Sequence, residues 1–181
     1  AASGGCAPRW NTALGYYFDT FVSLQGRCPA SVLQEALQEC ARYEALLSKN
    51  RQGSDVWRLN HAQGERVPVS EETRAILSMA QEVSEASHGW FDVTIAPASA
   101  LWDFKAEQPA LPGAEALAQA AALVDYTQVS ITAAGVRLGA GQSIDLGGIA
   151  KGYVADALVS FLADRGVTDA LINIGGNVKA L

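Results

Sequence analysis

Hydrophobic and polar residues alternate with a period of two near the start of the chain, which predicts a β-strand. The alternation runs over residues 14–25, and Gly26 ends it. A second alternation, over residues 129–138, is interrupted by Thr-Ala-Ala-Gly and predicts a hairpin. Three further segments are short and apolar and are expected to be extended: residues 90–96, where Pro97 would end the segment, 143–146 and 170–174.

Elsewhere apolar residues recur every three or four positions, which predicts amphipathic helices. These helices are expected after Pro29 and Ser31, after Ser70, over residues 114–123 and after Lys151. Ser31 and Gln34 have the spacing of a capping box, and two glutamates follow Ser70, where the helix dipole favours them. Residues 51–64 and 108–113 are expected to be loops, the first with room for a helical turn at residues 55–59.

Composition limits the classes of protein that the chain can represent. The chain has 181 residues, 49% of them hydrophobic, which is enough for one domain with a core. We expect residues 1–13 to be a flexible segment and residues 14–181 to form that domain. The net charge of −6 argues against nucleic acid or an anionic membrane surface as the main partner.

The cysteines bear on the compartment. Cys6 follows Ala-Ala-Ser-Gly-Gly, which resembles the end of a bacterial lipoprotein signal, after which the cysteine is lipidated. On that interpretation the protein lies in the periplasm or on the outer face of the cytoplasmic membrane, and Cys28 and Cys40 could pair. The alternative interpretation is three unconnected thiols, and the residues alone leave both open.

The strongest chemical signal lies in residues 143–156. A short apolar strand ends at Asp145, two glycines turn the chain, and Lys151 stands where an amphipathic helix begins. Backbone N–H groups and the positive end of a helix dipole meet at such a turn, and both favour an anionic ligand. The segment is neither a Walker A loop nor a Rossmann fingerprint. We expect a phosphate-bearing ligand here, with a plain strand-to-helix turn as the alternative.

Two other segments have chemical potential but weaker signals. Trp90 and Phe91 offer flat ring faces, and Asp92 could accept a hydrogen bond from a ring N–H or a ribose hydroxyl. Residues 48–60 could line a cofactor cleft. Aromatic residues usually pack in cores and polar loops are usually solvated, so the residues alone favour a structural role for both segments.

Read in order, these segments resemble the ApbE-type flavin transferases (FAD:protein FMN transferases), formerly labelled thiamine-biosynthesis lipoproteins. The resemblance covers nearly the whole chain. The segments that carry it are Phe18-Asp19-Thr20, residues 48–60, Gly89-Trp90-Phe91-Asp92, Asp145-Leu-Gly-Gly-Ile-Ala-Lys-Gly-Tyr and Leu171-Ile-Asn-Ile-Gly-Gly-Asn. The resemblance implies an α+β, T-fold-like fold in which helices pack on an antiparallel sheet.

The resemblance also implies a reaction. In that family FAD binds in a cleft, with Mg²⁺ on its pyrophosphate. A threonine hydroxyl of an acceptor flavoprotein attacks the phosphorus on the flavin side, FMN becomes linked through a phosphodiester, and AMP leaves. The metal would screen the pyrophosphate charge and stabilise the leaving phosphate.

The resemblance assigns site residues but no catalytic residue. Gly148 matches the position whose backbone carbonyl binds the metal, Phe18 falls where the family often has a methionine against the flavin, and Asn50 falls where an aromatic residue is common. The implied FAD-binding residues are Phe18, Asn50, Trp90, Phe91, Asp92, Asp145 and Lys151.

The family's pattern extends further than this sequence. It continues with a His-containing Asp-Pro-x-x-Gly segment and a metal loop rich in Asp and Thr, so we expect this chain to be an N-terminal portion that lacks part of the metal site. One carbonyl does not hold Mg²⁺ by itself. Two other functions stay open: an FAD-binding module without catalysis, and an FAD pyrophosphatase that releases free FMN and AMP.

Overall fold

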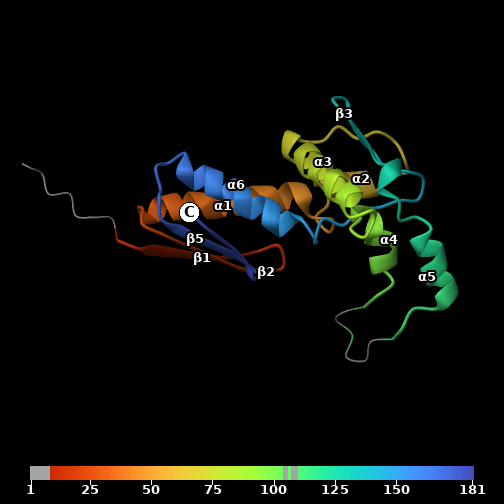
Figure 1. Cartoon of the computed structure of the whole chain (residues 1–181), viewed down its shortest axis with the longest axis horizontal. Coiled ribbons are helices and arrows are strands. Elements are labelled where there is room, and N and C mark those ends of the chain that lie inside the picture. Colours follow the sequence, from red (N-terminus) through yellow and green to blue (C-terminus); the bar gives the residue numbers. More distant parts are fainter. Residues whose placement is uncertain (1–8, 104–105, 107–109) are drawn as a thin grey trace, which may run out of the picture. The chain divides into compact units, whose positions relative to one another are not determined.

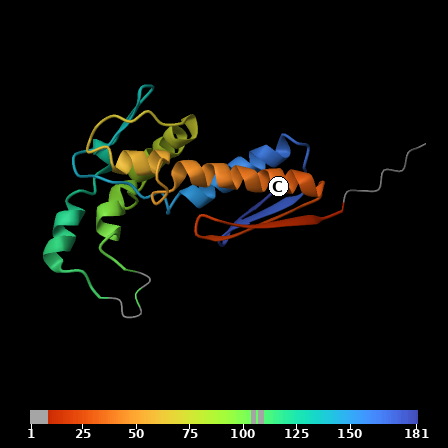
Figure 2. The same cartoon turned by 180° about the vertical axis from the view of Figure 1, so that it is seen from behind.

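The chain folds into two compact units. A computed structural model describes residues 9–103, 106 and 110–181 (Figures 1 and 2). The first unit takes in the chain up to Ala45 together with Ala150–Leu181, and the second is Leu46–Ile149. Cys6 and part of the loop expected at residues 108–113 lie outside the described residues. The assignment of residues 14–181 to one domain stays a prediction.

The first unit is an antiparallel sheet with helices on one face. The strand order is β1-β2-β5-β6, and every neighbouring pair is antiparallel. Helices α1 and α6 lie side by side along this sheet in both views (Figures 1 and 2). The elements are β1 (Asn11–Tyr17), β2 (Thr20–Gly26), α1 (Ala30–Leu47), α6 (Ala150–Ala163), β5 (Ala170–Ile174) and β6 (Asn177–Ala180). The predicted α+β fold with an antiparallel sheet is confirmed.

The single strand expected over residues 14–25 is wrong, because the chain reverses at Phe18 and Asp19. Both residues have positive φ, 57° and 56°, as both central residues of a type I′ hairpin turn do. Asn-Gly is the sequence typical of this turn, so Phe-Asp did not predict a turn here. The Phe18 N–H donates to Glu44 Oε1 at 2.7 Å, which helps to hold the turn.

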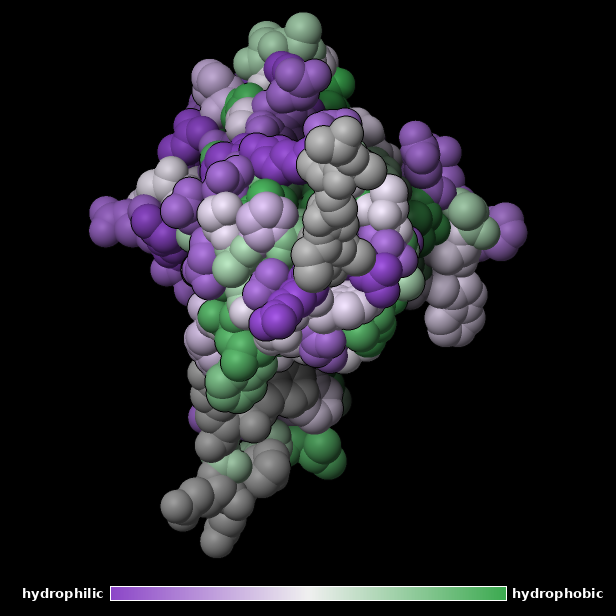
Figure 3. Space-filling model, turned by 90° about the vertical axis from the view of Figure 1, so that its left-hand side faces the viewer, coloured by the Kyte–Doolittle hydropathy of each residue, from purple (hydrophilic) through white to green (hydrophobic). Residues whose placement is uncertain are grey.

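The two faces of this sheet differ in chemistry. One face is buried and includes Val22, Leu24, Ile172 and Ile174. The register places uncharged side chains on the other face: Thr12, Leu14, Tyr16, Phe21, Ser23, Gln25, Leu171, Asn173, Val178 and Ala180. Phe21 is 80% exposed there and meets Tyr16 edge to face. Figure 3 shows hydrophobic side chains exposed among hydrophilic ones on one side of the molecule.

The second unit is built from short helices and one hairpin. Its core includes Val56, Leu59, Ile76, Leu77, Val136 and Ile144. The helices predicted after Ser70 and over residues 114–123, the helical turn predicted at residues 55–59 and the hairpin are confirmed. The elements are α2 (Asp55–Asn60), α3 (Glu71–Ala86), η1 (Val93–Ile95), α4 (Ala96–Ser99), α5 (Ala114–Ala121), η2 (Tyr126–Gln128), β3 (Ser130–Thr132) and β4 (Gly135–Arg137).

Two segments expected to be extended strands are not strands. Residues 93–99 form η1 and α4, and Pro97 stands in the first turn of α4, where its missing N–H is tolerated. Residues 143–146 contain no strand, because their backbone groups bond outside any sheet. Ile144 exchanges hydrogen bonds with the side chain of Asn60 at 2.7 and 2.9 Å, and the Asp145 N–H donates to the Val93 carbonyl at 2.8 Å.

A buried carboxylate joins the starts of α2 and α3. Asp55 is only 5% exposed. It accepts hydrogen bonds from the Ser70 N–H at 2.8 Å and the Thr73 hydroxyl at 2.7 Å, and it pairs with Arg58. Burial opposes ionisation of this group, but these hydrogen bonds outweigh it and lower the pKa of Asp55 below its ordinary value.

Cys28 and Cys40 are buried and free, so the disulfide left open by the sequence does not form in this structure. Burial raises the pKa of the Cys40 thiol to about 12, and a backbone hydrogen bond only partly opposes that shift. Burial also raises the pKa of the Cys28 thiol. Among the helices that the structure describes, none has the length and apolar character needed to cross a bilayer.

Candidate functional site

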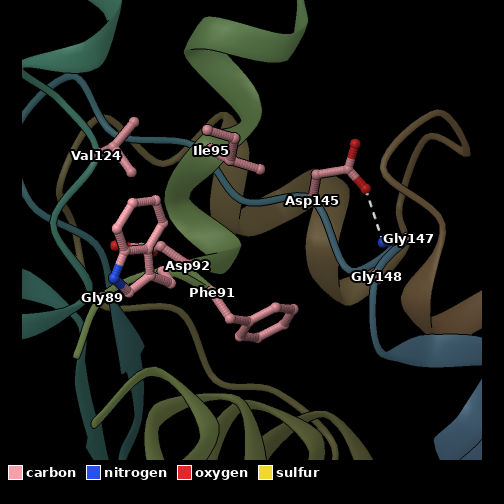
Figure 4. A pocket seen from close by; sticks show the side chains of 9 residues that line it. Gly89, Phe91, Asp92, Ile95, Val124, Asp145, Gly147 and Gly148 are labelled. Atoms are coloured by element: carbon pink, nitrogen blue, oxygen red, sulfur yellow. Dashed lines mark hydrogen bonds between the residues drawn. The ribbon is translucent and has the colours of Figure 1, made fainter. Parts of the chain in front are cut away.

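The second unit contains a cavity of about 410 Å³, within the range typical of small-molecule sites. Its wall combines aromatic, aliphatic, acidic and glycine residues (Figure 4). The lining residues are Gly89, Trp90, Phe91, Asp92, Ile95, Val124, Asp145, Gly147 and Gly148. The structure therefore brings the Trp90-Phe91-Asp92 segment and the Asp145–Gly148 segment to one pocket, although they lie far apart in sequence.

The turn that follows α3 delivers the two aromatic residues to the pocket. His88 and Gly89 have positive φ, 53° and 81°, and they end the helical path. The Ser87 hydroxyl accepts from the Phe91 N–H at 3.0 Å, which fixes the chain as it leaves the turn. Trp90 is 93% exposed, so its indole presents nearly all of its surface to solvent. An exposed indole beside a pocket can stack on a planar ring.

The carboxylate of Asp92, directly after the two aromatic residues, binds the backbone of η1 and of η2. Its Oδ1 accepts from both the N–H and the hydroxyl of Thr94, each at 2.7 Å, and so caps η1. Its Oδ2 accepts from the Tyr126 N–H at 2.8 Å. Asp92 thus ties η1 to η2 and shapes the pocket wall, and its predicted contact with FAD stays a prediction.

Several contacts hold Asp145 in place. Its N–H bonds to Val93, its Oδ1 accepts from the Gly147 N–H at 2.8 Å, and its Oδ2 lies 2.5 Å from Lys49 Nζ. The dashed line in Figure 4 marks the bond to Gly147. The Asp145 side chain is 24% exposed and that of Lys49 is 39% exposed. The ion pair is therefore partly screened by solvent.

Lys49 is the polar partner that the sequence did not reveal. The lysine stands in the polar loop after α1, and the two residues of the pair are 96 positions apart. The sequence around a lysine in a polar loop does not indicate which carboxylate it will pair with. The family resemblance assigns no role to Lys49 either.

The other predicted site residues do not line this cavity. Asn50 lies in the second unit and is exposed, and its N–H donates to the Ser48 hydroxyl at 3.3 Å. Phe18 and Lys151 belong to the first unit. Phe18 occupies the β1–β2 turn, and Lys151 is the second residue of α6, close to the positive end of its dipole. Their roles in cofactor binding stay predictions.

The acidic and imidazole groups of the described residues do not make a magnesium site. Across residues 9–103, 106 and 110–181, no group of three or more His, Cys, Asp or Glu side chains is placed to hold a metal ion. Mg²⁺ takes near-octahedral oxygen ligands. The Gly148 carbonyl, the one ligand that the resemblance suggests, does not meet this requirement alone.

A four-stranded antiparallel sheet with two long helices, and a pocket lined by aromatic rings and a carboxylate, define an α+β protein that is suited to bind a ring-bearing ligand. Residues 16–181 match the ApbE family, and the chain belongs to this family. The resemblance seen in the sequence is therefore confirmed.

Individual relatives agree with this placement. An FAD:protein FMN transferase of Treponema pallidum (strain Nichols) is 33% identical over 174 residues, which cover 88% of this chain and 48% of the relative. One of Klebsiella pneumoniae (strain 342) is 35% identical over 155 residues, covering 83% and 49%. The solved apo structure of Pseudomonas stutzeri flavinyl transferase ApbE superimposes with a TM-score of 0.87 at 25% identity, covering 97% and 58%. The chain spans about half the length of the curated relatives that it matches.

Proposed function

We propose that the protein to which this chain belongs is an FAD:protein FMN transferase. It transfers FMN from FAD to a threonine hydroxyl of a partner flavoprotein. In the reaction the threonine oxygen forms a bond to the phosphorus on the flavin side. The bond from that phosphorus to the bridging oxygen breaks, AMP leaves with that oxygen, and the hydroxyl proton is released. The names of the relatives support this proposal.

One structural observation carries the proposal for this chain. Two of the segments that carry the likeness to the family, around Phe91 and around Asp145, line the same cavity. Phe91 and the exposed Trp90 offer ring faces, and the Asp145 carboxylate offers acceptor oxygens. A flavin nucleotide has a planar ring system and N–H and O–H donors, which match these groups.

The phosphate part of the ligand needs positive charge. Lys151 stands at the start of α6, where its ammonium and the helix dipole both attract anions. In the proposal Lys151 binds the pyrophosphate, Asn50 and Phe18 contribute further contacts to FAD, and Asp92 contacts the ligand as well as the backbone.

Magnesium dependence is also part of the proposal. When bound, Mg²⁺ would neutralise pyrophosphate charge, with the Gly148 carbonyl as one ligand and phosphate oxygens as others. The described residues do not complete its coordination shell. What this chain contributes by its own residues is the binding and orientation of the nucleotide.

Anchoring through a lipid at Cys6, and a position in the periplasm or on the outer face of the cytoplasmic membrane, complete the proposal. The support is the Ala-Ala-Ser-Gly-Gly-Cys sequence. Mass spectrometry of the N-terminal peptide, recovered from the membrane fraction of the source cells, tests it. A lipid mass on Cys6 is expected, and an unmodified thiol in a soluble fraction would contradict it.

The transfer is tested with purified protein, FAD, Mg²⁺ and an acceptor flavoprotein. The expected products are an acceptor whose mass has risen by that of FMN less one water, because a phosphodiester has formed, and an equal amount of AMP. Replacement of the acceptor threonine by valine should abolish both, and the Treponema pallidum relative is the positive control. FAD binding without AMP release would favour the binding module. Free FMN and AMP without an acceptor would favour the pyrophosphatase.

A further inference from the structure

Only one residue of the Lys49–Asp145 ion pair lines the cavity of the candidate site. Asp145 lines the cavity, whereas Lys49 is absent from the lining and reaches the carboxylate from the loop after α1. Lys49 Nζ and Asp145 Oδ2 are 2.5 Å apart, so the ammonium and the carboxylate are in direct contact and form a charge-assisted hydrogen bond. Lys49 therefore affects a ligand in the cavity through Asp145.

The negative charge of the proposed ligand explains why the charge of Asp145 needs a positive partner. FAD carries negative charge on its pyrophosphate, and a carboxylate without a partner at the pocket wall repels an anion. With Lys49 beside it, the wall presents a nearly neutral pair that keeps its acceptor oxygens.

We propose that Lys49 is a positioning residue of the flavin-nucleotide site: it orients the Asp145 carboxylate and compensates its charge, so that a phosphate-bearing flavin is not repelled. This inference rests on the proposed function, because it takes an anionic flavin nucleotide as the ligand. Lys49 does not touch the reacting atoms.

A purely structural role for Lys49 is the competing explanation, and the surroundings argue against it. Asn60, at the end of α2, the helix that follows this loop, already joins the Asp145 segment through two hydrogen bonds with Ile144. The loop itself is closed by the Ser54 hydroxyl, which donates to the Ser48 carbonyl at 2.5 Å. Loss of Lys49 should therefore leave the fold in place.

The test measures FAD affinity by flavin fluorescence for wild type and Lys49→Met at low and high salt. At low salt we expect Lys49→Met to weaken binding by about three- to tenfold, a range suited to a half-exposed pair. The loss should shrink at high salt, because salt screens the repulsion from Asp145. Lys179→Met is the matched control, because it removes an equal charge from another lysine–aspartate pair. The partner of Lys179 is Asp156, and neither residue lines the cavity.

Asp145→Asn and Lys49→Arg complete the experiment. The effect of Lys49→Met should nearly vanish in the Asp145→Asn background, where there is no charge to compensate, and Lys49→Arg should retain most of the affinity. A loss that is the same at both salt concentrations and in both backgrounds would overturn the inference and assign Lys49 to loop structure. An affinity of Lys49→Met within twofold of wild type at low salt would also overturn the inference. If wild type itself binds no FAD, the proposed function fails, and that result differs from the failure of the Lys49 variants alone.

Discussion

The ring of Phe91 lies against the backbone of Gly148, so closely that a β-carbon at Gly148 would stand 3.1 Å from Phe91 Cε2. Both residues line the candidate cavity. The absence of a side chain at Gly148 therefore determines where the phenyl ring lies. The glycine is needed here for space, because Gly148 does not have positive φ.

We expect Gly148→Ala to displace the Phe91 ring by a few tenths of an ångström. Overpacking of this kind costs about 1 kcal/mol of stability, while the change in the pocket wall should lower FAD affinity several-fold. Thermal melting and FAD titration measure the two effects. Gly113→Ala is the control, because a β-carbon there meets no atom within 4 Å. The stability loss should disappear in Phe91→Leu; a loss that persists there would show that the ring is not its cause.

Asp92→Ala should destabilise the second unit whether or not FAD binds. It removes the acceptor for the Thr94 and Tyr126 N–H groups, and partly buried donors left without partners cost about 1–3 kcal/mol in total. Chemical denaturation without ligand measures this cost. If stability is unchanged and only FAD affinity falls, Asp92 acts on the ligand alone.

The stability of the fold should fall in acid partly through Asp55. Its pKa is lowered in the folded protein, so its contribution is present above the unfolded pKa, near 3.9, and is lost as pH falls through the folded value. We expect the loss of unfolding free energy between pH 6 and pH 3 to be smaller in Asp55→Asn than in wild type. Equal pH dependence in the two proteins would contradict the assignment.

Cys40 should be inert in the folded protein. Its pKa near 12 leaves almost no thiolate at pH 8, and its side chain is buried. In a Cys6→Ser background, iodoacetamide should label Cys28 and Cys40 slowly until denaturant is added. Because the folded pKa is raised, stability should be full below about pH 8.5 and fall above it. Cys40→Ala should reduce that alkaline loss, to which Cys28 also contributes, and rapid native labelling of Cys40 would contradict this prediction.

The sequence predicted the helices well, because their apolar positions repeat with the helical period and their ends carry local signals. Ser70 shows this directly: its hydroxyl accepts from the Thr73 N–H at 3.1 Å, as its place before two glutamates suggested. The segment around Asp145 was also found from its glycines and its lysine, whereas Trp90-Phe91-Asp92 was assigned to the site only by the family resemblance, because aromatic residues usually pack in cores.

Features that depend on distant partners could not be predicted. The β1–β2 turn uses Phe18 and Asp19 in a conformation that glycine normally supplies, and contact with Glu44 helps to hold it. Val93 and Ile95 favour strands, yet the Asp92 cap makes them a helical turn. The pairing of Lys49 with Asp145 depends on a fold that brings the two residues together.

The same ion pair says something about how the chain is assembled. The second unit starts at Leu46 and ends at Ile149, so Lys49 and Asp145 stand just inside its two ends, and their contact shows that these ends lie close together. A segment with adjacent ends can be accommodated within a host fold without separating the host's own elements. The unit that carries the pocket therefore has the form of a sequence insertion between α1 and α6, whose two ends lie close together. Its sequence could diverge, or be exchanged, while the sheet of the first unit stays intact.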